Sequence, residues 1–381
     1  MILRACEIDE FIRRNRVKEV VCFGAGNWLQ ILSDEFQSEI ESVYAYAVDS
    51  NHELWGSVRS VGKRVIDVRP PQFLYENINP DTVILISSGE HHVEIYEHLN
   101  SMEALRNTEC YIVSFIHNCE LDRIAYGVSF APENFQMNSK PVIPKIIHYT
   151  WFSGERLPDG AKRCIDSWSE HCPDYEIKEW NADNYDLTKH NYVYEAIQAK
   201  KWGFAGDYVR LDVIYNHGGF YFDLDVELLR NIDELRYNSA FCGFETARTI
   251  NLGSGFGALK GHRVIKKLRD CYDDVPFIRQ DGTLNLEASP FYQTKTLMEL
   301  GANINCEFQV IDDLAIYPAI YFAPKSLLTE RVNKSPYSYS IHNFEGSWLT
   351  EEDVRLRSAE LAMKRQAMSD GAKIEIASTK P

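Results

Sequence analysis

The sequence predicts an α/β protein built from two domains. At 381 residues the chain exceeds the length of one average domain, and its 45% apolar content is enough for two cores. Short apolar runs that favour strands alternate with longer segments that favour helices in both halves. Between the halves, residues 126–144 lose this periodicity and contain several Gly, Pro and Asn residues. We therefore predict a domain at 1–126, a linker at 127–142 and a second domain at 143–381.

The first domain opens with a pattern typical of a parallel sheet. An apolar strand at 20–23 runs into the turn Gly24-Ala-Gly26, a helical segment follows, and a strand over 43–48 ends in Asp49. The elements expected after it are a strand at 82–88, a helix at 93–99 and a strand at 111–116. This alternation predicts a small Rossmann-like parallel α/β sheet with helices on its faces.

The turn at Gly24 and Gly26 has two interpretations. Asp49 stands where a dinucleotide-binding domain places the carboxylate that meets a ribose hydroxyl. The third glycine of that fingerprint would fall at Leu29, which weakens the match. The turn therefore either binds a cofactor such as NAD or a sugar nucleotide, or is a tight strand-to-helix connection without a ligand.

The middle of the second domain contains the stretch around which the chain is organised. Residues 208–216 carry apolar side chains without an internal Gly or Pro, and Gly218-Gly219 supplies the left-handed residue that ends a helix. An aromatic segment then favours a buried strand. Asp223 and Asp225 follow it two residues apart, so they point to one side of an extended chain.

Carboxylates that converge at a strand end form an oxygen site of the kind that Mg²⁺ or Mn²⁺ prefers. Such an ion leaves coordination positions open for phosphate oxygens, so a diphosphate is the expected ligand. Upstream, Asp207 and Arg210 are three residues apart and share a helix face, where they can grip hydroxyls or a phosphate. Each feature alone is common in acidic turns or solvated helices, but their succession along one segment indicates a functional site.

The net charge and the first ten residues exclude some classes of protein. The net charge is 40 − 56 = −16, which argues against a nucleic-acid partner and against electrostatic docking to anionic lipid. The first ten residues are charged where a signal peptide needs an apolar core, and no run approaches 18 apolar residues. We predict no transmembrane segment and a cytoplasmic location, with peripheral association at the inner face of the membrane left open.

Four pieces of the chain carry a resemblance to a known family: Ile143-Pro-Lys-Ile-Ile-His-Tyr-Thr-Trp151, Gly206-Asp207 with Arg210, Gly218-Gly-Phe-Tyr221-Phe-Asp223-Leu-Asp225, and His342 with Gly346-Ser347-Trp348. They resemble the DXD-containing sugar-transferase family, which includes capsular-polysaccharide sugar transferases and Golgi initiating α-mannosyltransferases and is related to large glucosylating toxins. The chain departs from the family at Gly206, where a Ser is usual. The resemblance implies a type A glycosyltransferase fold, a Rossmann-like mixed sheet, for the second domain.

The resemblance also implies a metal site and a catalytic set. Asp223 and Asp225 would hold Mn²⁺ or Mg²⁺, and His342 would complete the coordination sphere. Asp207 and Arg210 would act with both aspartates in catalysis. The alternative for His342 is a histidine satisfied within the core.

Contacts with the donor follow from the same resemblance. Trp151 would stack on the nucleotide base, and Tyr221 would orient ribose or sugar hydroxyls. Ser347 and Trp348 would donate hydrogen bonds to the diphosphate. A tryptophan that simply packs in the core is the alternative for position 151.

We therefore expect a metal-dependent hexosyltransferase in surface-polysaccharide or capsule synthesis. The donor would be a nucleotide-diphosphate sugar, a UDP-hexose or GDP-mannose, and the acceptor a saccharide or a lipid-linked glycan. The resemblance implies retention of the anomeric configuration. Two alternatives are an NAD-dependent or sugar-nucleotide-modifying enzyme that acts through the first domain, and a non-catalytic scaffold. The oligomeric state is left open.

Overall fold

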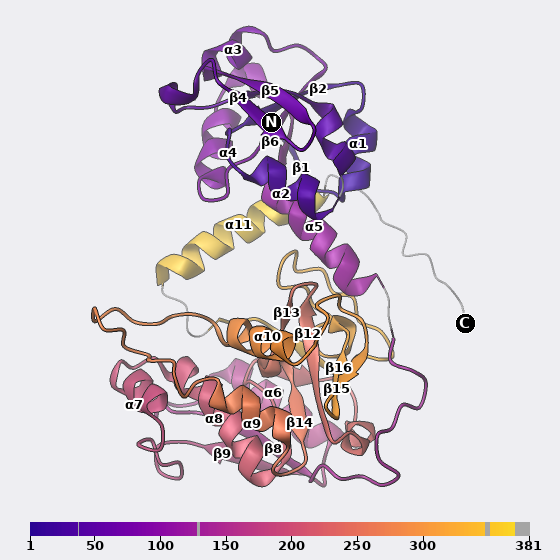
Figure 1. Ribbon diagram of the computed structural model, residues 1–381, viewed down its shortest axis with the longest axis vertical. Coiled ribbons are helices and arrows are strands. Elements are labelled where there is room, and N and C mark those ends of the chain that lie inside the picture. The colour runs from indigo at the N-terminus through magenta and orange to yellow at the C-terminus, as the bar shows by residue number, and fades with distance from the viewer. Residues whose placement is uncertain (37, 128–129, 347–350, 370–381) are drawn as a thin grey trace. The chain divides into compact units, whose positions relative to one another are not determined.

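The computed structural model describes residues 1–36, 38–127, 130–346 and 351–369, and the chain divides into two compact units (Figure 1). Residues 1–123 together with helix α11 (Glu351–Ser369) form the first unit, and the intervening chain forms the second. Both units combine helices with a sheet. The α/β class predicted from the sequence is therefore confirmed in both.

The first unit is built on a sheet of strand order β1-β7-β6-β2-β3-β5-β4. Its strands are β1 (Ile2–Arg4), β2 (Glu19–Phe23), β3 (Tyr44–Val48), β4 (Val58–Val61), β5 (Arg64–Arg69), β6 (Thr82–Ile86) and β7 (Glu109–Ile112). Its helices are α1 (Ile8–Asn15), α2 (Trp28–Glu35), α3 (Pro71–Glu76), α4 (His92–Asn100), α5 (Val113–Tyr126), which ends in the second unit, and α11. The pairings are parallel except for the antiparallel hairpin of β4 with β5. The predicted small parallel sheet is thus present.

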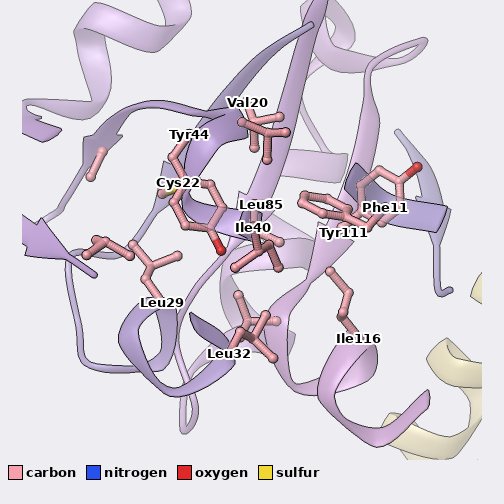
Figure 2. Packing of buried hydrophobic residues seen from close by; sticks show 14 of the residues in the cluster. Phe11, Val20, Cys22, Leu29, Leu32, Ile40, Tyr44, Leu85, Tyr111 and Ile116 are labelled. Carbon is pink, nitrogen blue, oxygen red and sulfur yellow. The ribbon is translucent and has the colours of Figure 1, made fainter. Parts of the chain in front are cut away.

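Both faces of this sheet are buried, because successive side chains of its strands alternate between two cores. On β2, Val20 and Cys22 enter one core, whereas Val21 and Phe23 enter the other. Figure 2 shows the first of these cores, in which the labelled strand residues face side chains of α1, α2 and α5. The continuous apolar runs read as strands in the sequence are the consequence of this double burial.

The first unit differs from the sequence prediction in two places. The predicted strand at 111–116 is wrong in its second half, since β7 ends at Ile112 and α5 begins at Val113. A short apolar run fits a buried strand and a buried helix face equally well, and here the helix prevails. The C-terminal helix was assigned to the domain at 143–381, but α11 packs in the first unit, where Ala367 is fully buried and its carbonyl accepts from the Ala5 N–H at 3.2 Å.

The second unit is built on a mixed sheet of strand order β15-β16-β12-β14-β10-β8-β9, with β13 paired to β12. Its strands are β8 (Ile146–Thr150), β9 (Glu176–Trp180), β10 (Gly219–Tyr221), β12 (Ala240–Thr246), β13 (Thr249–Ile250), β14 (Phe256–Ala258), β15 (Gln309–Ile311) and β16 (Leu314–Tyr317), and β11 (Val226–Leu228) pairs with β17 (Ser340–His342) in a separate ladder. Its helices are α6 (Asp159–His171), α7 (Asn191–Gln198), α8 (Trp202–His217), α9 (Arg263–Asp270) and α10 (Ser289–Glu299). A mixed sheet is what the resemblance led us to expect.

Helix α8 and strand β10 form the local framework of the acidic stretch. Nearly every side chain of α8 from Phe204 to Ile214 is buried. The helix ends at His217. Its C-cap Gly218 has φ +69° and Gly219 follows with φ +107°, conformations that favour glycine. A Cβ at Gly219 would also lie 2.6 Å from the Ile146 carbonyl oxygen, so the close approach of β8 needs glycine there. The Gly-Gly stop predicted from the sequence therefore has two physical reasons.

Strands β8 and β10 lie side by side and run parallel, with Ile147 opposite Phe220. Their carboxyl ends meet at one edge of the sheet, so Trp151, after β8, and Asp223, after β10, follow neighbouring strand ends.

Across the described ranges, no helix combines the length and apolarity needed to cross a bilayer.

Candidate active site

Arg210 joins the helix to the acidic segment. Its Nη2 lies 2.9 Å from Asp207 Oδ1, one turn back on α8, and 3.0 Å from Asp223 Oδ1, after β10. The guanidinium is almost fully buried, and its carbon lies 5.3 Å from the centre of the Tyr221 ring. The structure therefore brings together Asp207, Arg210 and Asp223, which the sequence could place only on neighbouring elements.

Burial governs the electrostatics of this trio. Burial raises the pKa of Asp207 to about 6, against the opposing charge of Arg210. It also raises the pKa of Asp223, again against Arg210. Two carboxylates share one guanidinium, so the trio carries a net negative charge when both are ionised. A cation bound nearby would relieve that charge.

Asp225 faces a different partner. Strands β11 and β17 are antiparallel with Val226 opposite His342, and this register sets His342 beside Asp225 although the two residues are 342 − 225 = 117 positions apart in the sequence. Asp225 Oδ1 lies 3.1 Å from His342 Nε2, and Asp225 Oδ2 accepts from the Glu345 N–H at 2.9 Å. Burial would lower the pKa of His342, but the carboxylates of Asp225 and Glu245 outweigh it and raise the pKa to about 10. Burial would raise the pKa of Asp225, but His342 lowers it to about 2.

The other ring nitrogen of His342 meets a buried polar network. His342 Nδ1 lies 3.1 Å from Ser254 Oγ and 3.4 Å from Glu245 Oε1. The same Glu245 oxygen accepts from Asn251 Nδ2 at 2.6 Å. These three partners come from the end of β12 and the loop that follows β13.

In the sequence, Asn251-Leu-Gly-Ser-Gly-Phe-Gly257 predicts either a turn or a Gly-rich loop that passes close to a sugar. In the structure this loop packs directly on the acidic site. The Asp223 N–H donates to the Gly253 carbonyl at 3.1 Å. A Cβ at Gly253 would clash with the Asp223 carboxylate and lie 3.0 Å from Arg210 Nη1. Helix α10 supports the loop from behind, because Gln293 Oε1 accepts from the Leu252 N–H at 2.9 Å. At the start of α10, Ser289 opposes part of the rise in the pKa of Asp207.

The predicted donor contacts are placed as follows. Trp151 is half-buried at the end of β8, where its Nε1 donates to the Glu155 carbonyl at 2.6 Å. Tyr221 is fully buried beneath Arg210, and its hydroxyl lies 2.9 Å from Thr150 Oγ1. In this structure Tyr221 supports Arg210, and its contact with a donor stays a prediction. Ser347 and Trp348 lie outside the described residues.

The implied metal can be tested against the separation of its candidate ligands. Two neighbouring ligands of an octahedral ion, each at ~2.1 Å, stand about 3 Å apart. Asp225 Oδ1 and His342 Nε2 have that separation, whereas Asp223 is engaged by Arg210. Within the described part of the chain, no group of three or more His, Cys, Asp or Glu side chains is arranged to hold a metal. Because Mg²⁺ is commonly held by one or two carboxylates plus substrate phosphates, Asp225 fits such an ion. His342 could join it only in its neutral form, and the three-residue set stays a prediction.

No sequence pattern pointed to Glu245, and Ser254 and Asn251 stood out only as part of the Gly-rich segment at 251–257. An acid at the end of the buried strand Ala240–Thr246 was the available signal, but nothing local connects it to His342. In the first unit, Asp49 Oδ2 accepts from the Ala25 N–H at 2.7 Å. The predicted ribose-binding carboxylate therefore holds its own Gly-rich turn in this structure.

Residues 158–242 match the family described as "Glycosyltransferase sugar-binding region containing DXD motif". This range contains α8, β10 and both aspartates of the acidic segment. This part of the chain is thus similar to the DXD-containing sugar-binding region of that family, in agreement with the resemblance found in the sequence.

Two curated relatives come from Schizosaccharomyces pombe. "Inositol phosphoceramide mannosyltransferase 2" is 34% identical over 105 residues, which cover 26% of this chain and 30% of the relative. "Inositol phosphoceramide mannosyltransferase 3" is 33% identical over 133 residues, which cover 33% of this chain and 36% of the relative. The alignments therefore span about a third of the length of these relatives.

Among solved structures, the "PaToxG Glycosyltransferase" aligns over 48% of this chain and 76% of its own, with 17% identity and a TM-score of 0.32. A "glycosyltransferase involved in the glycosylation of the major capsid of PBCV-1" aligns over 57% of this chain and 100% of its own, with 12% identity and a TM-score of 0.29. Both structures are therefore only distantly similar to this chain.

Proposed function

We propose that the second unit is a glycosyltransferase that moves a hexose from a nucleotide-diphosphate sugar to a glycan acceptor and uses Mn²⁺ or Mg²⁺. The observation that carries this proposal is the grouping at the end of β10. There, Asp223 and Asp225 lie inside the family-matched region, Arg210 contacts the first aspartate and His342 contacts the second. Acidic ligands near a buried guanidinium suit a substrate that carries both phosphates and hydroxyls.

We assign metal binding and substrate orientation to different residues of the site. The ion supplies Lewis-acid stabilisation of the negative charge that develops on the leaving diphosphate. Asp225 and His342 would hold it. Arg210 fixes the carboxylates of Asp207 and Asp223 in place, so that both are oriented before a sugar binds. The loop at Gly253 and the start of α10 keep water from the back of this trio.

The finer parts of the proposal concern donor and acceptor. UDP-hexose and GDP-mannose are the donors to test, and the two relatives named as inositol phosphoceramide mannosyltransferases favour including mannose. Their names also point to an acceptor that carries a lipid, which agrees with the predicted saccharide or lipid-linked glycan. Retention, a role in surface polysaccharide and a location at the cytoplasmic face of the membrane remain predictions from the sequence.

The test measures hydrolysis of nucleotide sugars by the purified full chain. A panel of UDP-hexoses and GDP-mannose is incubated with Mn²⁺, with Mg²⁺ or with EDTA, and the released nucleoside diphosphate is quantified. We expect turnover of at least one donor that requires the metal and is lost in Asp225→Asn. Metal-independent turnover, or full activity of Asp225→Asn, would contradict the proposed site.

Thermal unfolding separates this function from the alternative centred on the first unit. A ligand that binds only the folded chain raises the melting temperature. Stabilisation by Mn²⁺ together with UDP or GDP supports the transferase. Stabilisation by NAD alone, with no effect of the metal and nucleotide, would favour the alternative instead.

A further inference from the structure

A short hairpin between α9 and α10 presents an apolar face that the proposed reaction does not use. Ile278 pairs with Leu284 in an antiparallel bridge, and the Asn285 N–H donates to the Phe277 carbonyl at 2.7 Å. Because side chains of paired strands alternate between two faces, Ile278, Leu284 and Leu286 share one face, here called the hairpin face. Ile278 is 39% exposed and Leu286 is 48% exposed. The opposite face carries Phe277 and Asn285, and both are buried.

The buried side of the hairpin fixes it on the second unit. The Phe277 ring lies 5.4 Å from the Tyr192 ring of α7 and 5.4 Å from the Phe204 ring of α8. Glu195 Oε2, also on α7, accepts from the N–H groups of Phe277 and Ile278, each at 2.9 Å. Helices α7 and α8 therefore hold the hairpin in place, so the hairpin face is formed before any ligand binds.

The hairpin lies near the acidic site along two segments of the chain. Phe204, which contacts Phe277, stands three residues before Asp207 on α8, about one helical turn. Leu286 stands three residues before Ser289, so their Cα atoms are at most ~11 Å apart. Ser289 in turn is close enough to Asp207 to oppose part of the rise in its pKa. An elongated molecule bound along the hairpin face would therefore extend to the acidic site.

Charge and size restrict what the hairpin face can bind. Residues 272–288 contain four carboxylates and one guanidinium, a net charge of 1 − 4 = −3. That guanidinium, Arg279, donates to the Leu284 carbonyl and to Asn285 Oδ1, each at 3.2 Å. The negative charge disfavours an anionic lipid surface or a nucleic acid. Three aliphatic side chains also offer far less than the ~800 Å² that each partner buries in a stable protein interface. An uncharged alkyl chain meets neither obstacle.

We propose that the hairpin face binds the alkyl chain of a lipid-linked acceptor and thereby directs the acceptor's sugar toward the acidic site. This inference rests on the proposed function of that site. It names the segment that distinguishes a lipid-linked acceptor from a free saccharide. The alkyl chain and the aliphatic side chains remove apolar area from water when they meet, so the gain in affinity grows with the length of the alkyl chain that is covered.

The first experiment compares dodecyl and methyl glycosides of the same hexose as acceptors for the purified full chain. Mannosides, glucosides and galactosides are used below the micelle concentration, at saturating donor. The KM of a dodecyl glycoside is expected to be at least ~30-fold lower than that of its methyl counterpart. The double variant Ile278→Thr/Leu286→Gln should raise the dodecyl KM about 10-fold and leave the methyl KM and donor hydrolysis unchanged.

Two results of this experiment would overturn the inference: equal KM values for the two glycosides in the wild type, or an unchanged dodecyl KM in the double variant. Val310→Thr is the matched control. Val310 is also an exposed aliphatic side chain of the second unit, 47% exposed, but it lies on the edge strand β15. Its replacement should leave the KM values of both glycosides unchanged.

Photolabelling tests the inference in the unmutated chain and needs no turnover. The probe is a dodecyl mannoside with a diazirine on its alkyl chain, added together with Mn²⁺ and UDP or GDP, and the labelled peptides are identified by mass spectrometry. Label is expected within residues 276–286. Label confined to other segments would overturn the inference, also where the wild type accepts none of the glycosides.

Two other occupants of the hairpin face are tested by sedimentation. A wild type that dimerises, with a double variant that does not, would assign the face to a second copy of the chain. Phosphatidylcholine vesicles that bind the wild type but not the double variant would assign it to a membrane surface. Either result overturns the inference. Absence of donor hydrolysis in the wild type would refute the proposed function, whereas donor hydrolysis without label on the hairpin would refute only the role of the hairpin face.

Discussion

Protonation of His148 should destabilise the second unit, because its ring is held as one neutral tautomer at the junction that carries the acidic site. His148 is fully buried in β8. Its Nε2 lies 2.9 Å from the Gly218 carbonyl oxygen, and its Nδ1 lies 3.0 Å from the indole Nε1 of Trp180. A carbonyl can only accept and an indole N–H can only donate, so Nε2 carries the proton. A second proton on Nδ1 would face the indole N–H.

The expected magnitude follows from the shift in pKa. Burial lowers the pKa of His148 from 6.5 to about 4, against the opposing effect of the Gly218 carbonyl. The unfolded chain therefore takes up the proton first as the pH falls, so the stabilisation is complete above about pH 6.5 and is lost toward pH 4. At 1.36 kcal/mol per pKa unit the full loss is ~3 kcal/mol, and at pH 5 it is ~2 kcal/mol.

The assay is urea unfolding followed by tryptophan fluorescence, at pH 7.5 and pH 5.0, for the wild type and His148→Gln. The variant cannot titrate at this position, so its free energy of unfolding should fall by ~2 kcal/mol less than that of the wild type between the two pH values. Other titrating groups are common to both proteins and cancel in this difference. Equal pH dependence in the two proteins would refute the reasoning. Trp180→Phe removes the indole N–H, and it should raise the pKa of His148 and reduce the loss in the same direction.

Three further outcomes concern the acidic site and its support. Asp225→Asn removes one charge but keeps the side-chain shape, and its Mn²⁺-dependent kcat/KM for donor hydrolysis should fall ~100-fold or more with an unchanged circular dichroism spectrum. Gly253→Ala drives a methyl group into the Asp223 carboxylate and against Arg210 Nη1, so metal-dependent turnover should drop ~10-fold; wild-type turnover would show that the loop yields freely. Asp212→Asn weakens charged bonds to two cationic side chains, and chemical denaturation should show a loss of ~2 kcal/mol with Mn²⁺ affinity unchanged.

The central stretch could be read from the sequence because its geometry is local. The helix stop at Gly218 and Gly219, the aromatic strand and the spacing of Asp223 and Asp225 all lie within a few residues of one another. Local backbone preferences and the two-residue period of a strand act over that range. The pairing of Arg210 with Asp223 was not local in this sense, since it required the helix to fold back along the strand.

The contacts of His342 depend on the pairing register of distant strands, which the sequence does not reveal. His342 reaches Asp225 only because β17 pairs with β11 at one particular offset, and a shift by one residue would turn its ring to the other face. Glu245 and Ser254 reach His342 through β12 and the loop after β13, which carry no spacing signal linked to the motif. The role of His342 came from the family resemblance and not from any pattern around it.

The sequence by itself determined the two α/β units, the helix-stop-strand-acid order of the central stretch and the acidic character of the site, because each depends on residue types and periods along the chain. The tertiary structure alone decided which groups meet: Arg210 between two carboxylates, His342 beside Asp225 and Glu245 behind it, and the helix at 351–369 on the first unit. The physical reason is that contacts between distant segments depend on strand register and on the packing of whole elements, and a linear pattern does not encode either of them directly.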